Sequence, residues 1–169
     1  GAARKGEDTM QEHGLKISEL VTLFNLEVLN RGSDYDTALL TITDVNRPGL
    51  QFHSFYDYFD PRRLQVLGKA EITYLKGLTT EQRRKCFDDL FLYDIPALVI
   101  SRGLDCFPEC LESARVHERT MLRTEETTVE FTSHTIEYLN RVLAPCVTRH
   151  GVLLDISGEG VMITGDSGI

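Results

Sequence analysis

The sequence predicts an α/β domain over residues 15–144, with a mostly parallel sheet flanked by helices. Two observations carry this prediction. Short apolar segments of strand type alternate along the chain with segments whose apolar residues recur at helical spacing. In addition, the fully apolar run Ala97–Ile100, between Pro96 and Gly103, is followed by a helical segment and by another short apolar run. A strand–helix–strand unit of this kind predicts a parallel pair with a right-handed crossover.

The first half of the domain is expected to hold one helix and three strands. The helix starts near Ser18, because apolar residues recur there at helical spacing. A strand is expected at Leu26–Leu29. The β-rich segment Leu39–Thr43 predicts a second strand, which stops at the turn Asn46–Gly49. Leu64–Leu67 predicts the third.

The second half begins with a helix that runs from a capping box at Thr79 and Gln82 to about Phe91. Its inward face is predicted to consist of Cys86, Phe87, Leu90 and Phe91. After the strand Ala97–Ile100, the chain is expected to form a helix from about Pro108 to His117 and a strand at Met121–Leu122.

A long helix from about Thr127 to Leu143 closes the domain, and Pro145 stops it. The apolar stripe that should dock this helix on the domain is predicted as Val129, Thr132, Ile136, Leu139 and Leu143.

Residues Phe52–Phe59 include five aromatic side chains. Such a cluster can serve as a ligand platform, but aromatic residues more commonly pack in a core, and core packing is the preferred interpretation.

The composition excludes some classes of partner. A net charge of −8 argues against nucleic acid or an anionic membrane as the main partner. No apolar run approaches the roughly 20 residues of a membrane span. The polar segment Gly1–Gly14 has no signal-peptide character and is expected to be a disordered tail or a tag. A soluble, cytoplasmic protein is therefore expected.

The cysteines show no Cys-x-x-Cys spacing; they are Cys86, Cys106, Cys110 and Cys146. Cys106 and Cys110 could in principle bind a metal, but no histidine lies at a supporting spacing, so ordinary thiols are preferred.

The last 25 residues, 145–169, are predicted to begin a second domain. Strands at 148–157 and 160–164 should form a hairpin that leads into a glycine-rich loop. A strand followed by such a loop is typical of a phosphate-binding loop, G-x-x-x-x-G-K-[ST], whose backbone N–H groups surround an anion. Here Gly165 is the first glycine, and the Lys and Ser/Thr of the motif are absent from the sequence. The candidate nucleotide-binding residues are Gly165, Asp166, Ser167, Gly168 and Ile169.

Gly-Asp-Ser-Gly also surrounds the nucleophile of chymotrypsin-like proteases. That alternative is rejected, because the chain has no tryptophan, no Ala-Ala-His-Cys segment and a helix-rich pattern unlike a double β-barrel.

Several segments resemble the bacterial HPr kinase/phosphorylase family. The match includes His150–Ile169, and further segments extend it over about residues 15–169: Phe24–Asn30, Asn46–Leu50, Leu67–Glu71 and Ser101–Leu104. The chain departs from the family at Ser157, where an aromatic residue is common, and at Glu159, where an apolar residue is common. The resemblance implies a complete N-terminal domain, with a fold like that of the N-terminal domains of the Mur ligases, followed by an incomplete P-loop kinase domain.

The resemblance also implies an activity, a site and partners. The family phosphorylates a seryl hydroxyl of the phosphocarrier HPr with ATP or pyrophosphate and Mg²⁺, and removes that phosphate with inorganic phosphate as acceptor, in carbon catabolite regulation. The residue by itself favours a structural strand histidine, whereas the resemblance implies that His150 corresponds to a catalytic histidine near the phosphates. The family is hexameric through its kinase domains. We expect the present chain to have no activity of its own; alternatively, its N-terminal domain is a sensory or protein-binding module.

Overall fold

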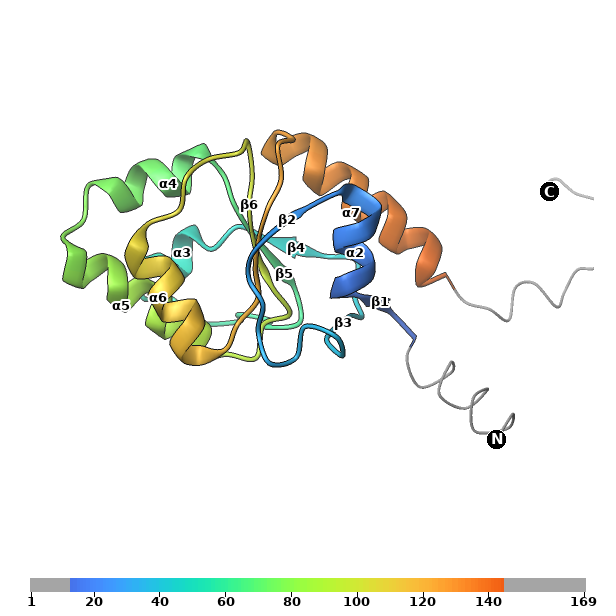
Figure 1. Cartoon of the computed structure of the whole chain (residues 1–169), viewed down its shortest axis with the longest axis horizontal. Helices are drawn as coiled ribbons and strands as arrows, with labels where there is room; N and C mark the ends of the chain where they lie inside the picture. Colours follow the sequence, from blue (N-terminus) through green and yellow to red (C-terminus); the bar gives the residue numbers. More distant parts are fainter. Residues whose placement is uncertain (1–12, 145–169) are drawn as a thin grey trace, which may run out of the picture.

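The computed structural model describes residues 13–144, which form a three-layer α/β domain (Figure 1). The elements are β1 Leu15–Lys16, α2 Ile17–Phe24, β2 Glu27–Asn30, β3 Leu39–Leu40, β4 Val45–Asn46, α3 Gly49–Phe52, β5 Leu64–Leu67, α4 Lys69–Lys76, α5 Thr80–Phe91, β6 Leu98–Ile100, α6 Pro108–His117, β7 Met121–Arg123 and α7 Thr128–Val142.

The central sheet has the order β2-β7-β6-β5-β4. Strands β4 to β7 are parallel, and β2 pairs antiparallel with β7 at one edge. The predicted parallel pair of β6 and β7 is confirmed, with Val99 opposite Leu122. The mostly parallel α/β fold expected from the sequence is therefore present in the described residues.

Helices cover both faces of this sheet. Figure 1 shows α3, α4, α5 and α6 on one side and α2 and α7 on the other. Each face has its own apolar cluster: Phe87, Phe91 and Leu67 belong to the first, and Leu64 and Phe131 to the second. Because β5 and β6 are buried on both faces, they consist almost entirely of apolar residues, as is usual for central parallel strands.

The capping box of α5 forms as predicted. The Gln82 backbone N–H donates to Thr79 Oγ1 at 3.1 Å, and Thr79 N–H donates to Gln82 Oε1 at 2.9 Å. The predicted inward face is also buried; it consists of Cys86, Phe87, Leu90 and Phe91.

Some predictions about elements were wrong. Leu39–Thr43 is not one strand, because β3 ends at Leu40 and pairs with β1, and the chain returns to the main sheet only at β4. Helices α3 and α4 were not predicted, because both are short and begin at residues that also favour turns: Pro48 and Gly49 for α3, and Gly68 for α4.

The buried face of α7 differs from the predicted apolar stripe. Val129 is 73% exposed, whereas the buried residues of α7 are Thr128, Phe131, Thr135 and Leu139. Only Leu139 belongs to both sets. The bulky Phe131 occupies the sheet side of α7, and an edge-to-face contact with Phe24, at 5.9 Å between ring centroids, joins it to α2.

Candidate functional site at the carboxyl edge of the sheet

Two of the segments that carry the sequence resemblance meet at the carboxyl ends of β4 and β5. They line a hollow of about 420 Å³ between α3 and α4, which we call the α3/α4 hollow. Its lining residues are Arg47, Gly49, Leu50, Phe52, His53, Ala70, Glu71 and Tyr74. Ligands of parallel α/β sheets commonly bind outside the carboxyl ends of the strands, so this hollow is the candidate site in the described residues.

An ion pair lies at the polar end of the hollow. Arg47 Nη2 donates to Glu71 Oε1 at 2.8 Å, and Arg47 Nε donates to the same oxygen at 3.3 Å. The Gly68 backbone N–H also donates to Glu71 Oε1, at 2.7 Å. The Glu71 side chain is 10% exposed and that of Arg47 is 43% exposed. Glu71 therefore anchors the guanidinium to the start of α4, and the guanidinium keeps a solvent-accessible surface.

A third resemblance segment, Ser101–Leu104, contacts the carboxyl end of β5 through hydrogen bonds of Ser101. Ser101 is buried, and its hydroxyl donates to the Leu67 carbonyl oxygen at 2.9 Å. A second hydrogen bond, 2.6 Å long, joins Ser101 Oγ to Thr128 Oγ1 at the start of α7. The ends of β5 and β6 are thus tied to α7.

Gly68 lies where these groups converge. A Cβ atom at this position would be 2.5 Å from both Arg47 Nη2 and Thr128 Oγ1. A side chain here must therefore displace both the guanidinium and the Thr128 hydroxyl.

Gly68→Ala is expected to lower the free energy of unfolding by about 1–3 kcal/mol, because overpacking strains the contacts with Thr128 and Arg47. Gly49→Ala is the matched control, since nothing lies within 4 Å of a Cβ atom there. It should change stability by less than about 0.5 kcal/mol. Urea denaturation of both variants measures the difference, and equal effects would contradict the described packing.

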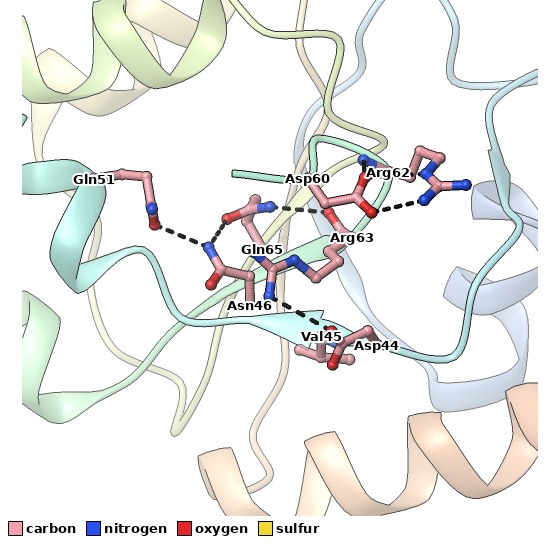
Figure 2. A network of polar contacts seen from close by, with 8 residues as sticks. All are labelled: Asp44, Val45, Asn46, Gln51, Asp60, Arg62, Arg63 and Gln65. Atoms are coloured by element: carbon pink, nitrogen blue, oxygen red, sulfur yellow. Dashed lines mark hydrogen bonds and ion pairs between the residues drawn. The ribbon is translucent and has the colours of Figure 1, made fainter. Parts of the chain in front are cut away.

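An amide network fixes the wall of the hollow that α3 provides. Figure 2 shows Asn46 between Gln51 and Gln65: its Nδ2 donates to Gln51 Oε1 at 3.0 Å and to Gln65 Oε1 at 2.7 Å. Gln65 is fully buried, and its Nε2 donates to the Arg63 carbonyl oxygen. These bonds connect β4, β5 and α3, so they hold α3 in place.

The aromatic segment Phe52–Phe59 divides between core and surface. Phe52 is buried and contacts Phe87 edge-to-face at 5.5 Å, which confirms the core interpretation for that residue. Tyr56 stacks on Tyr93 at 4.9 Å and is partly buried. Phe55 and Tyr58 are exposed, at 46% and 99%.

A serine, an aspartate and a histidine also come together between α5 and α6. Ser113 Oγ donates to Asp88 Oδ1 at 2.5 Å, and His117 Nε2 lies 3.2 Å from the same oxygen. In a hydrolytic triad the serine contacts the histidine, which in turn contacts the aspartate. Here both contact Asp88 and Ser113 is buried, so the cluster joins two helices and is not a nucleophile site.

Asp88 should make stability depend on pH. Burial raises the pKa of its carboxyl, but hydrogen bonds from Ser113, Arg84 and His117 together lower the pKa below its ordinary value. A lowered folded-state pKa stabilises the fold above the unfolded-state pKa, and this contribution is lost as the pH falls through the folded-state pKa.

Asp88→Asn is expected to cost about 1–2 kcal/mol near neutral pH, since the carboxylate is partly solvent-exposed. The cost should shrink below about pH 4. Denaturation at several pH values measures it, with Asp89→Asn as control, because Asp89 pairs with the exposed Lys85 on the same helix. A cost for Asp88→Asn that stays constant down to about pH 2 would contradict this role of the carboxylate.

The predicted catalytic residue His150 and the predicted loop Gly165–Ile169 lie outside the described residues, as do the predicted hairpin and residues 1–12 of the predicted tail. In residues 13–144, no group of three His, Cys, Asp or Glu side chains could hold a metal ion. Cys86 and Cys110 are buried, and burial raises the pKa of both thiols. Over the same residues, no helix is both long enough and apolar enough to cross a membrane.

A solved structure shares the fold. The CBS and DRTGG domains of the regulatory region of Clostridium perfringens pyrophosphatase, complexed with the activator diadenosine tetraphosphate, match with a TM-score of 0.50 and 12% sequence identity. The match covers 76% of this chain and 51% of that chain.

Sequence comparisons identify much closer relatives. HPr kinase/phosphorylase of Alkaliphilus metalliredigens is 44% identical over 155 residues, and that of Clostridium perfringens is 42% identical over 156 residues. Each match covers 92% of this chain and 50% of the relative, so the chain spans about half the length of these curated relatives. Residues 15–139 match the family described as "HPr Serine kinase N terminus". From these matches and the α/β fold, we conclude that the chain belongs to the HPr kinase/phosphorylase family.

Proposed function

We propose that this chain is the N-terminal part of a bifunctional HPr kinase/phosphorylase. The observation that carries the proposal is the 44% identity over 155 residues to a relative of that name. The complete enzyme would phosphorylate a seryl hydroxyl of HPr with ATP or pyrophosphate, and would remove the phosphate with inorganic phosphate as acceptor. It would act as a cytoplasmic hexamer, assembled through its kinase domains, in carbon catabolite regulation.

Residues 145–169 would begin the kinase domain. Successive backbone N–H groups of Gly165–Ile169 would bind phosphate oxygens, and His150 would lie near the same phosphates. ATP with Mg²⁺ would supply the transferred phosphoryl group, held in part by residues that this sequence does not contain. Positioning and charge neutralisation provide most of the rate in such transfers.

Residues 15–144 would be a separately folded domain. Residues of two resemblance segments line the α3/α4 hollow, which contains no paired nucleophile and base. A hollow with such lining residues favours ligand binding over catalysis, and so supports a sensory role of the N-terminal domain within the enzyme.

The 169-residue chain alone is expected to bind Mg-ATP weakly, with a dissociation constant above about 10 µM, and not to phosphorylate HPr. The Lys and Ser/Thr of the phosphate-binding motif, which contact the β/γ-phosphates and Mg²⁺, are absent from it. A full-length protein that carries these residues should phosphorylate HPr on serine. Calorimetry measures ATP binding, and a phosphorylation assay measures activity, for both proteins. An inactive full-length protein would contradict the proposed function. An active 169-residue chain would contradict the proposal that catalysis needs residues outside this sequence.

A further inference from the structure

The α3/α4 hollow combines an apolar wall with two opposite charges at one end. Leu50, Phe52 and Tyr74 form much of the apolar wall, and Leu50 is 63% exposed. At the polar end, Arg47 and Glu71 bring one positive and one negative charge. The hollow of about 420 Å³ is large enough for a small molecule of metabolite size.

The ion pair leaves hydrogen-bonding capacity on both partners. All the bonds that Glu71 accepts from residues 13–144 go to Oε1, from Arg47 Nε, Arg47 Nη2 and Gly68 N. Within the same residues, Glu71 Oε2 and Arg47 Nη1 have no hydrogen-bond partner. A ligand can therefore accept from the guanidinium and donate to the carboxylate without breaking the pair.

The charge balance selects the class of ligand. A simple anion would be attracted by Arg47 but repelled by Glu71, and a simple cation would meet the reverse. A molecule with a carboxylate and an ammonium group close together satisfies both, because guanidinium–carboxylate and ammonium–carboxylate contacts are charge-assisted. An apolar substituent on such a molecule would cover Leu50 and contact Tyr74, and so remove apolar surface from water.

The polar end is also held rigidly. Glu71 is fixed by the Gly68 N–H, and Gly68 is packed against Arg47 and Thr128. His53, which forms part of the wall, is held by a contact of 3.0 Å between its Nδ1 and the Gly49 carbonyl oxygen, and its ring lies 4.5 Å from that of Tyr74. Prior ordering of both the charges and the rings lowers the entropic cost of binding.

We propose that the α3/α4 hollow is a binding site for a free α-amino acid with an apolar or aromatic side chain. The amino acid's carboxylate binds Arg47, its ammonium group binds Glu71, and its side chain lies on Leu50, Phe52 and Tyr74. This site shares no residue with the predicted phosphate-binding loop, and the proposal does not depend on the proposed kinase activity.

The test is calorimetry of the 169-residue chain with single L-amino acids at up to about 10 mM, with thermal unfolding as a second readout. At least one apolar or aromatic amino acid should bind and raise the melting temperature. The N-acetyl derivative and the carboxamide of that amino acid should each bind at least about tenfold more weakly, since each lacks one of the two charges.

Arg47→Gln should weaken binding at least about tenfold, and Arg47→Lys should weaken it less, because it keeps the charge but loses the planar donor geometry. Arg62→Gln is the matched control. Arg62 forms an ion pair with Asp60, 2.8 Å long, and does not line the hollow, so its replacement should leave binding unchanged. Leu50→Ser tests the apolar wall with a residue that is already exposed, and should also weaken binding. Circular dichroism verifies the fold of each variant.

Three results would overturn the proposal. The first is that no amino acid binds at about 10 mM. The second is that the N-acetyl derivative binds as tightly as the free amino acid, which would indicate a site for simple carboxylates. The third is that a folded Arg47→Gln variant binds as tightly as the unchanged chain.

Discussion

Leu139→Ala is expected to lower the free energy of unfolding of the 169-residue chain by about 2–5 kcal/mol. Leu139 is fully buried on α7 and belongs to the same apolar cluster as Phe131, Val66 and Leu20. Truncation to alanine removes the transfer free energy of the side chain and leaves a cavity, because β5 and α2 hold the surroundings in place. Loss of this contact loosens the helix that closes one face of the sheet.

Urea denaturation measures the effect, and Val129→Ala is the matched control. Val129 lies on the same helix but is 73% exposed, so its truncation should change stability by less than about 0.5 kcal/mol. A change of less than about 0.5 kcal/mol for Leu139→Ala would contradict the docking of α7. A large loss in the Val129→Ala variant would instead favour the stripe first expected from the sequence.

His150→Ala is expected to reduce both phosphorylation and dephosphorylation of HPr by about 10²–10⁴-fold in a full-length enzyme that carries these residues. His150 lies near the start of the predicted strand 148–157, which is expected to pair with the strand entering the phosphate-binding loop, so its ring would be close to the transferred phosphate. An imidazole with a pKa of about 6.5 can donate or accept a proton near neutrality. Both directions share one phosphoryl-transfer geometry, so both should be affected.

The measurement is the initial rate of seryl-phosphate formation and of phosphate-dependent removal, with circular dichroism as the folding test. His134→Ala is the control, because His134 is an exposed residue on α7 that contacts Glu126. Both rates within about threefold of the unchanged enzyme would assign a structural role to His150. Loss of one direction alone would restrict it to a single proton transfer.

The sequence by itself was sufficient for the elements that have strong local signals. The α5 capping box, the helix α6 with Pro108 at its first position, and the apolar strand β6 were all predicted within about one residue. Each depends on residues within a few positions of one another, such as Thr79 and Gln82. The resemblance to the HPr kinase/phosphorylase family likewise followed from short contiguous segments, and the comparisons confirm it.

Only the tertiary structure decided which faces are buried and which distant residues meet. The pattern of α7 allowed a stripe through Val129, but packing against the sheet buried the face that carries Phe131. Arg47 and Glu71 meet because β4 and β5 are parallel neighbours, in a register that places Asn46 beside Gln65. No local signal specifies that register. It depends on the burial of β5 on both faces of the sheet and on the hydrogen bond from Asn46 to Gln65, and it brings the lining residues of the α3/α4 hollow together.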